Sequence, residues 1–354
     1  MNALKTSGIG IRFGKILLFS MSFFGMNGFA QSLPVRLAEV PGKSRIDVYI
    51  GEEWFTSYRF PSDLEKPVLF PVLAPGGVSV TRGFPLEPRP GERTDHPHHV
   101  GMWFNFGDVN GLDFWNNSYA VPQADKPKFG SVRHRQVLAP SAGNQGDFLK
   151  VRSHWVDFNG RVLLEEETEF RFSGQGSVRG VERSTTLTAA VPKVVFTDNK
   201  EGLLAIRVDR AFEEPLTEPE VLVGPDGKPM NRPTLDNAGV NGKYRNSEGE
   251  EGVAAWGRRA KWVKLSAVKD GVPLTIAMVD HPRNPGHPAH WHARGYGLFS
   301  VNNLGSRVFV PADPQIITTL VKGESIRFRH LFLVGRTQDL TDSEMNRLFS
   351  EFSR

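Results

Sequence analysis

The chain has 354 residues, no cysteine and a formal net charge of +4 at pH 7. The absence of cysteine excludes disulfides, thiolate zinc sites and iron–sulfur clusters, so the hydrophobic core must hold the fold by itself. The net charge is small and the basic residues are scattered, which argues against nucleic-acid binding. The glycine motifs that cradle phosphates or dinucleotides are also missing, so we expect no nucleotide cofactor.

The N-terminus has the pattern of a secretory signal peptide. Three basic residues precede an apolar run at 16–26, and Gly28-Phe29-Ala30 provides a small-x-small cleavage site. We therefore predict a signal peptide over 1–30 and a periplasmic or secreted mature chain over 31–354, with an uncleaved anchor as the alternative. No later stretch approaches the roughly 20 apolar residues of a membrane helix, so we expect no membrane span in the mature chain.

Most of the mature chain alternates between apolar and polar residues, with Gly, Pro, Asn and Asp at the breaks. This period of two, rich in β-branched and aromatic residues, predicts strands. We expect them at 45–50, 54–60, 148–158, 162–172, 178–188, 203–208, 259–268, 274–279, 296–301 and 325–334. So many strands with almost no helical pattern between them predict an all-β fold, a large antiparallel β-sandwich in one domain.

One helix is predicted near the C-terminus. Thr341 and Glu344 have the spacing of a capping box, and apolar residues follow at helical spacing, namely Met345, Leu348, Phe349 and Phe352. Two stretches, 111–146 and 211–252, lack any period. Loops of this length tend to be functional, and we expect one of them to cover the site.

Seven of the ten histidines lie in two windows, 95–99 (DHPHH) and 280–292 (DHPRNPGHPAHWH), and both begin with Asp-His-Pro. In extended chain, His96 and His98 point to one side, as do His290 and His292, because side chains alternate along a strand. If folding brings the windows together, several imidazoles meet at one point.

Three interpretations of the windows stay open. In the first, His96, His98, His290 and His292 bind one divalent metal. In the second, a histidine transfers protons and is oriented by a carboxylate, while arginine holds negative charge; the catalytic residues are then His96, His98, His99, His281, His292, Asp95 and Asp280. In the third, the histidines only satisfy backbone groups beside the prolines.

Amide, carboxylate, arginine and aromatic side chains near the windows are those that recognise sugar hydroxyls and sugar C–H faces. The substrate-binding residues on this hypothesis are Arg82, Arg294, Trp103, Asp108, Asn110, Trp115, Trp291 and Tyr296. The structural alternative is that Gly107-Asp108-Val109-Asn110-Gly111 forms a tight turn and that the tryptophans belong to the core.

Several motifs, in order along the mature chain, resemble the bacterial PmoA-like family. They are FPVLAPGG at 70–77, TR at 81–82, DHPHH at 95–99, GDVNG at 107–111, EETE at 166–169, AWGRRA at 255–260, DHP at 280–282 and WHAR at 291–294. The family name refers to a methane monooxygenase subunit, which is a multi-span membrane protein, so we discount methane oxidation for a chain without spans. The resemblance implies an exported protein of bacteria that degrade polysaccharides.

This chain departs from the family pattern at two positions. It has Val100 where a basic residue is usual and Phe106 where histidine is frequent, which puts full retention of the family's activity in doubt. By fold analogy, a large sandwich with these motifs is similar to the galactose mutarotase-like supersandwich, whose enzymes epimerise, cleave or eliminate sugars.

We therefore expect an exported enzyme that acts on a sugar or polysaccharide-derived substrate by histidine acid/base chemistry, as an epimerase, lyase or hydrolase. The alternatives are a metal-dependent enzyme with a multi-histidine site and a non-catalytic glycan-binding module. The expected partner is a small molecule or an oligosaccharide.

Overall fold

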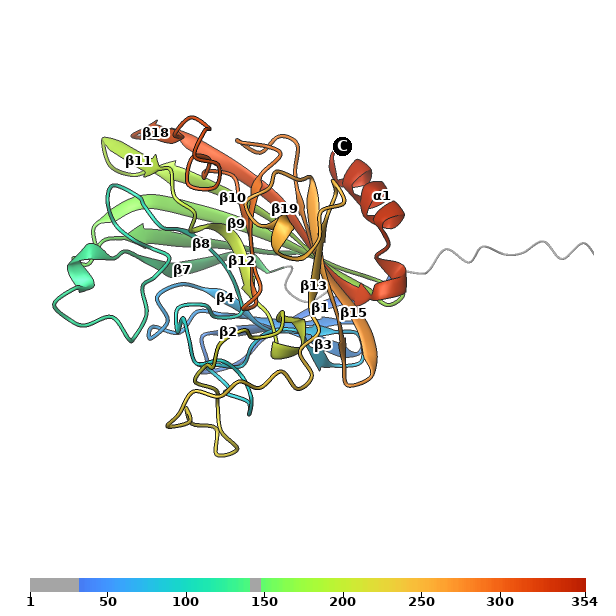
Figure 1. Cartoon of the computed structure of the whole chain (residues 1–354). Coiled ribbons are helices and arrows are strands. Elements are labelled where there is room, and N and C mark those ends of the chain that lie inside the picture. Colours follow the sequence, from blue (N-terminus) through green and yellow to red (C-terminus); the bar gives the residue numbers. More distant parts are fainter. Residues whose placement is uncertain (1–31, 141–147) are drawn as a thin grey trace, which may run out of the picture. The chain divides into compact units, whose positions relative to one another are not determined.

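A computed structural model describes residues 32–140 and 148–354, and its strands form two large antiparallel sheets (Figure 1). The predicted signal peptide lies outside the described residues. The first sheet, in spatial order, contains β1 (Val35–Glu39), β2 (Arg45–Ile50), β3 (Glu53–Arg59), β4 (Val68–Ala74), β6 (Met102–Phe106), β12 (Gly202–Arg207), β17 (Leu298–Asn302) and β16 (His290–Arg294), with β5 (Val78–Ser79) paired to β4.

The second sheet has longer strands. In spatial order it contains β13 (Lys243–Asn246), β14 (Trp262–Lys269), β15 (Val272–Asp280), β19 (Ser325–Arg336), β10 (Val178–Ala189), β9 (Val162–Gln175), β8 (Phe148–Val156) and β7 (Ser131–Pro140). A separate ribbon pairs β11 (Lys193–Thr197) with β18 (Ile317–Val321). The described chain also has 3₁₀ turns at Lys126–Lys128, Arg210–Phe212, Gly252–Ala255 and Thr337–Asp339.

The hydrophobic core lies between the two sheets. From the first sheet it receives alternate residues such as Phe104 on β6 and Ile206 on β12, and from the second sheet residues such as Phe170 and Phe328. The alternation along β9 and β10 places one apolar face inward and one polar face outward. The predicted all-β class and the antiparallel sandwich are confirmed.

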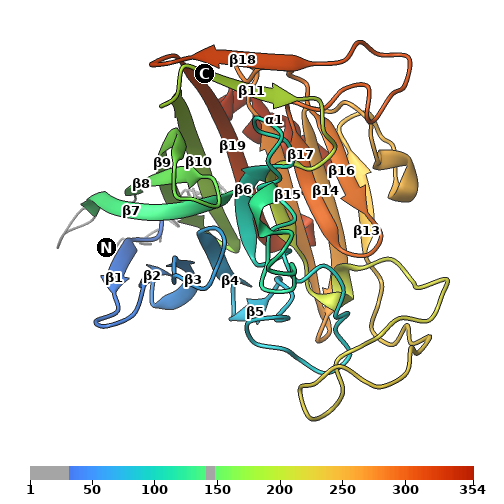
Figure 2. The same ribbon diagram turned by 90° about the vertical axis from the view of Figure 1, so that its left-hand side faces the viewer.

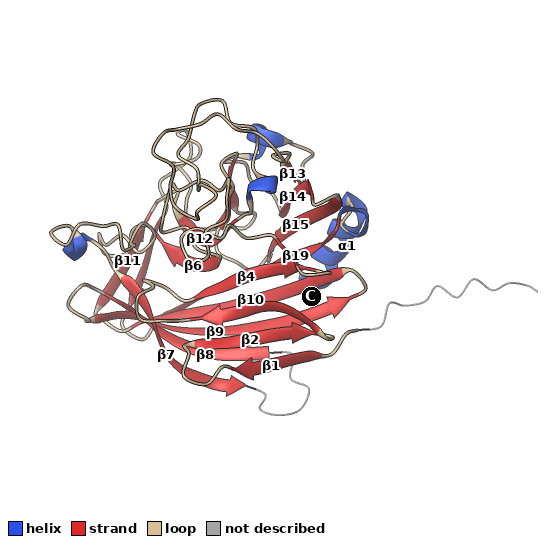
Figure 3. Cartoon of the chain, turned by 90° about the horizontal axis from the view of Figure 1, so that it is seen from below, coloured by secondary structure: helices blue, strands red, loops and turns tan. Residues whose placement is uncertain are grey.

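The C-terminal helix α1 (Asp342–Phe352) is also confirmed, and Figure 3 shows how little helix the rest of the fold contains. The hydroxyl of Thr341 accepts a hydrogen bond from the Glu344 backbone N–H at 3.3 Å, as an N-cap does. Met345 and Phe352 pack with Trp262 and Leu333 on the outward face of the second sheet. None of the helices in the described ranges has the length and apolarity that crossing a membrane requires.

Loops cover the outward face of the first sheet, and this is where the site is built. The long connection between β12 and β13, gold in Figure 2, lies against the segment that leads to β6. Backbone hydrogen bonds join the two segments, from Gly91 N to the Val223 carbonyl at 2.8 Å and from Thr94 N to the Val221 carbonyl at 3.1 Å. A small second apolar cluster, which includes Trp103, Trp115 and Leu298, fills the space beneath them.

Candidate functional site

The first histidine window forms a loop, residues 93–99, that we call the histidine loop. The side chain of Arg82 is 1% exposed and holds this loop from beneath. Its guanidinium donates hydrogen bonds to the backbone carbonyls of Arg93, Asp95, His96 and His99, at 2.8 to 3.3 Å. Arg82 therefore shapes the loop, and its guanidinium, predicted to bind substrate, is occupied by acceptors of the protein.

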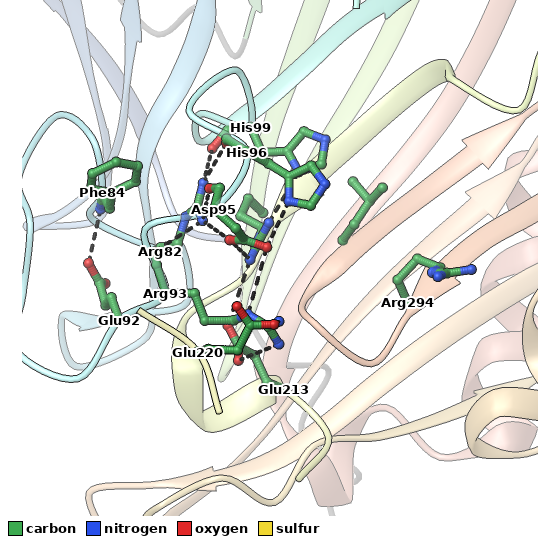
Figure 4. A network of polar contacts seen from close by, with 12 residues as sticks. Arg82, Phe84, Glu92, Arg93, Asp95, His96, His99, Glu213, Glu220 and Arg294 are labelled. Atoms are coloured by element: carbon green, nitrogen blue, oxygen red, sulfur yellow. Dashed lines mark hydrogen bonds and ion pairs between the residues drawn. The ribbon is translucent and has the colours of Figure 1, made fainter. Parts of the chain in front are cut away.

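Asp95 and His96 form a hydrogen-bonded pair at the tip of the histidine loop (Figure 4). The Nδ1 atom of His96 lies 2.7 Å from Asp95 Oδ2, while Asp95 Oδ1 accepts hydrogen bonds from Arg82 at 2.8 Å and Arg207 at 2.6 Å. Burial by itself would raise the pKa of Asp95, but Arg207, the His96 hydrogen bond and Arg82 together hold it well below its ordinary value. The carboxylate therefore stays ionised and fixes the imidazole.

The imidazole of His96 remains accessible. Its side chain is 39% exposed, and its ring lies parallel to those of His99 and Tyr296, with centroids 4.8 and 5.0 Å away. The backbone of His96 has a φ of 45°, in the left-handed region that non-glycine residues seldom occupy. Because Nδ1 is bonded to Asp95, the Nε2 atom is the one left for a ligand.

His99 lies beneath His96 and is fully buried. It accepts a hydrogen bond from Trp115 Nε1 at 3.2 Å and stacks on Trp103 at 5.2 Å. Burial, reinforced by the charges of His98, Arg207, His96 and Arg82, holds the pKa of His99 well below its ordinary value. His99 and the two tryptophans, which are 1%, 0% and 0% exposed, form the floor of the site, so the structure places Trp103 and Trp115 beneath the surface and not at the opening where the prediction put them.

His98 faces a different cavity from His96. This cavity of about 230 Å³ is also lined by Lys66, Pro97, Leu86 and Tyr119. The Nε2 atom of His98 is buried and has no hydrogen-bond partner in the described chain. Burial and the nearby charge of Lys66 hold the pKa of His98 well below its ordinary value, so this imidazole is neutral at pH 7.

The second histidine window contributes its C-terminal end to the same site. His292 Nδ1 lies 3.2 Å from the Lys200 carbonyl and 3.8 Å from the Glu201 carboxylate. Burial lowers the pKa of His292 to about 3, and the charges of Arg294, Lys200 and His96 act in the same direction. The charge of His96 acts on both His292 and Glu201, so the end of the second window lies near the histidine loop.

Arg294 and Tyr296 line a cavity of about 580 Å³ beside the Asp95–His96 pair, together with Arg93, Trp256 and the segment 214–218. Arg294 is exposed, and its guanidinium lies over the rings of Trp256 and Tyr296 at 5.7 and 5.5 Å. Figure 4 shows that Arg294 comes from a different part of the chain than the histidine loop. Both residues, predicted to bind substrate, thus line an opening of a size that could hold a small ligand.

Asp280, in contrast, lies in a buried network away from the histidine loop. Its carboxylate is 0% exposed and accepts hydrogen bonds from Asn284 and Asn303 at 2.7 and 2.9 Å, and from the Ala289 backbone N–H at 2.9 Å. The Nδ1 atom of His287 completes the set at 2.7 Å. Hydrogen bonds occupy both of its oxygens, so Asp280 organises the 280–292 segment, and no contact in the described residues joins this predicted catalytic residue to the histidine loop.

His281 and His290 also have structural partners. His281 Nε2 lies 2.8 Å from Arg329 and its ring packs edge-on against Phe352 of α1. His290 Nδ1 lies 2.7 Å from the Gly257 carbonyl, and its Nε2 accepts a hydrogen bond from Arg259 at 3.2 Å. No nitrogen remains free on His290, and His281, which the sequence predicted as catalytic, lies against Arg329 and α1.

The four-histidine metal set does not form. Within residues 32–140 and 148–354, no three histidine, aspartate or glutamate side chains gather in a way that could hold a metal ion. His96 uses Nδ1 for Asp95, His98 faces the other cavity, and His290 uses both nitrogens. The donor groups present therefore do not fit the predicted metal.

Three further predicted substrate contacts are structural. Trp291 is fully buried in the main core, and its Nε1 donates to the Ala260 carbonyl at 2.9 Å. Asp108 accepts from Gly111 N at 2.9 Å, and the Asn110 side chain bonds the backbone of Lys193 and Val195. The tight-turn alternative for 107–111 is the one the structure supports.

Four residues that the sequence analysis did not select complete the site: Glu201, Trp256, Arg207 and Glu213. Burial raises the pKa of Glu201, against the opposing charges of Lys200 and His96. Glu213 is 1% exposed and lies 4.0 Å from both Arg93 and Arg207. Trp256 stands in the AWGRRA motif, which could have marked it, whereas the other three occur in no motif that we recognised.

Another cavity of about 660 Å³ lies at the β7–β8 edge of the second sheet, lined among others by Arg133, Arg135, His154 and Phe158. None of the predicted site residues lines this cavity, and it contains no carboxylate–histidine pair. We therefore place the candidate site at the histidine loop.

The chain belongs to the family DUF6807, a family of unknown function whose model matches residues 45–350. No curated protein matches the chain. Among solved structures, it is similar to the GH36 α-galactosidase AgaB of Geobacillus stearothermophilus, with 9% identity, a TM-score of 0.41, and coverage of 84% of this chain and 40% of that one. The chain thus spans about two fifths of that enzyme.

Two smaller proteins match over nearly their whole length. A proposed aldose 1-epimerase of Escherichia coli K12 shows 10% identity and a TM-score of 0.37, covering 85% of this chain and 99% of that one. The Slr1438 protein of Synechocystis sp. PCC 6803 shows 9% identity and a TM-score of 0.35, covering 88% and 99%. At these TM-scores we draw nothing about activity from the likenesses, and the function is argued from the site.

Proposed function

We propose that this protein is an exported enzyme that acts on a sugar or a polysaccharide-derived substrate by acid/base chemistry, with His96 as the proton-transferring group. The observation that carries the proposal is the Asp95–His96 pair, in which an ionised carboxylate fixes Nδ1 and leaves Nε2 at the accessible side. Membership of the PmoA-like family and export to the periplasm or medium remain predictions from the sequence.

The geometry gives each group a distinct task. Asp95 receives the Nδ1–H of His96, so that Nε2 alternates between accepting a proton from substrate and returning one. Arg82 and Arg207 keep Asp95 ionised, so the proton stays on the imidazole while Asp95 stabilises the imidazolium that forms. His96 therefore changes charge without moving.

Glu201 is the second group that could hold a proton. Burial raises its pKa, which favours a protonated carboxyl, and His96 is close enough that its charge acts on Glu201. Epimerisation, elimination and hydrolysis of sugars all use an acid and a base that lie in different environments. Tyr296, whose ring is parallel to that of His96, offers an aromatic surface for the C–H face of a sugar.

A screen by ¹H NMR in D₂O tests the proposal, because it detects new anomers, new alkenes, released sugars and deuterium at exchanging carbons. We expect one of these signals with the wild-type protein on a panel of neutral and acidic sugars. His96→Asn should lower the rate about 10²- to 10⁴-fold. Asparagine tolerates a positive φ and can still donate to Asp95, so the loop should be retained.

The matched control is His154→Asn, which removes a partly exposed histidine on β8 outside the site. The rate of this variant should equal that of wild type. A His96→Asn rate within threefold of wild type would refute the assignment. Binding of sugars without any product would identify a glycan-binding module in place of an enzyme.

A further inference from the structure

We infer that the cavity beside the histidine loop binds a sugar that carries a carboxylate, and that Arg294 is the residue that recognises this group. The inference rests on the proposed function for the sugar and adds the charge of the substrate. The contacts that each arginine around the site makes support this inference.

Three of these arginines already form ion pairs with carboxylates of the protein. Arg82 and Arg207 share the Asp95 carboxylate, at 2.8 and 2.6 Å. Arg93 forms an ion pair with Glu220 and lies 3.7 Å from Asp95. None of the three has a guanidinium that is free to take a substrate anion.

Arg294 differs from them. Within the described residues its guanidinium has no hydrogen bond and no ion pair, and its contacts are with the faces of Trp256 and Tyr296. Stacking on aromatic rings orients the planar guanidinium and leaves its N–H donors at the edge. Such an edge matches the two oxygens of a carboxylate, which it can bind through two parallel hydrogen bonds.

Other donors around the cavity also lack acceptors. The indole Nε1 of Trp256 is buried and has no hydrogen-bond partner in the described structure, and the Nε of Arg93, 3.7 Å from Asp95, has no hydrogen bond either. Both residues line the same cavity as Arg294. Buried donors without acceptors are costly, and a ligand rich in oxygen atoms would satisfy them.

The acidic residues of the cavity do not neutralise Arg294. Glu220 is paired with Arg93. Burial raises the pKa of Glu214, and within the described residues no ion pair joins its carboxyl to Arg294. Glu214 and Glu218 come from the segment that follows β12, whereas Arg294 ends β16. They can accept hydrogen bonds from sugar hydroxyls, while the carboxylate of the sugar lies at Arg294.

The test measures binding by titration calorimetry, because binding does not require His96. The probes are D-galacturonate, D-glucuronate, their α-1,4- and β-1,4-linked di- and trisaccharides, and the methyl esters of each. We expect at least one acid to bind about 10- to 100-fold more tightly than its methyl ester, since a charge-assisted pair is lost in the ester. Arg294→Gln should abolish this difference and leave the affinity for the ester unchanged.

Arg258→Gln is the matched control, because Arg258 is an exposed arginine that does not line the cavity and pairs with Glu250 at 3.2 Å. This variant should keep the full preference for the acid. Equal binding of acid and ester by wild type, absence of binding by every acid, or an unchanged preference in Arg294→Gln would overturn the inference. The His96→Asn variant should retain the preference while losing turnover, so failure here is distinguishable from failure of the proposed function.

Discussion

The two Asp-His-Pro tripeptides have the same sequence and different surroundings. At 95–97 the aspartate faces two buried arginines and aligns an imidazole that is 39% exposed. At 280–282 the aspartate is 0% exposed, and its carboxylate oxygens are hydrogen-bonded to amide, backbone and imidazole groups of the protein. The first arrangement leaves a histidine nitrogen available to a ligand. In the second, the polar atoms of the aspartate are hydrogen-bonded to other groups of the protein.

The difference teaches that the partners of an aspartate decide its role more than the tripeptide does. Arginine keeps Asp95 ionised and is itself buried, so the imidazole is the part that meets solvent. Asn284 and Asn303 bind Asp280 from the protein side and tie the 280–292 segment to β19 and the loop after β17. A histidine cluster in a sequence can therefore divide into a reactive half and a structural half.

The largest effect that separates the two halves should come from Asp280→Ala. Removing this carboxylate takes the acceptor from the Asn303 amide, the Ala289 N–H and the His287 imidazole, while Asn284 keeps the Arg329 carbonyl; we expect the free energy of unfolding to fall by about 3 to 5 kcal/mol. Urea denaturation measures the loss. Turnover per folded molecule should stay within threefold of wild type.

Asp63→Ala is the control for this substitution, because Asp63 is exposed and should change the stability by less than about 0.5 kcal/mol. If Asp280→Ala were as stable as wild type, the structural assignment of the second tripeptide would be wrong.

A smaller effect is expected from Glu213, which lies behind the first tripeptide. Burial raises its pKa to about 7, although Arg207 and Arg93 act against the shift. The folded state thus keeps this proton up to about pH 7, whereas the unfolded chain releases it near the ordinary value of 4.5. The folded state binds more protons in this interval, so the stability due to Glu213 is present below pH 4.5 and is lost as the pH rises to 7.

The size of this loss is up to about 3 kcal/mol. Glutamine cannot titrate, so the Glu213→Gln variant should not lose this stability. The difference in the free energy of unfolding, variant minus wild type, should therefore increase as the pH is raised from 4.5 to 7. Urea denaturation at several pH values gives the comparison. Parallel pH profiles for the two proteins would contradict the assignment.

The smallest effect should come from Asn110→Ala, which tests whether the 107–111 turn belongs to the scaffold. The Asn110 side chain bonds the backbone of Lys193 and Val195, at 3.1 and 2.7 Å, and its φ is 55°. We expect a loss of about 1 to 2 kcal/mol in the free energy of unfolding. The affinity for sugar should be unchanged, as it should be in the control variant Asn159→Ala. Weaker sugar binding by Asn110→Ala would show that Asn110 belongs to the binding site after all.

Much of the fold could be predicted because amphipathic strands show a clear alternation of apolar and polar residues in the sequence. Each of the ten predicted strands corresponds to one in the structure, with ends that shift by at most a few residues, as for β9 and β10. The strands that were missed include β4, β6 and β16, whose residues are nearly all buried. Loops cover the outward face of the first sheet, so β4 and β6 have apolar residues on both faces and little alternation, whereas β16 alternates but has only 5 residues.

The site could be predicted in part for a related reason. Histidine, arginine and tyrosine near the windows pointed to His96, His292, Arg294 and Tyr296, which the structure brings together. Burial cannot be read from residue type, so Arg82, Trp103 and Trp291 were placed at the ligand although they lie inside. Glu201 and Arg207 stand at the two ends of β12, and Glu213 follows the 3₁₀ turn after it, far along the chain; the pairing of β12 with β6 brings them to the histidine loop.

The most direct test of the account is a crystal structure of the His96→Asn variant with a bound sugar taken from the NMR and calorimetry panels. The account predicts that the sugar lies between position 96, Tyr296 and Arg294, with one of its oxygens in hydrogen-bonding distance of the side chain at position 96. A sugar bound beside Asp280, or in the cavity next to Phe158, would contradict it.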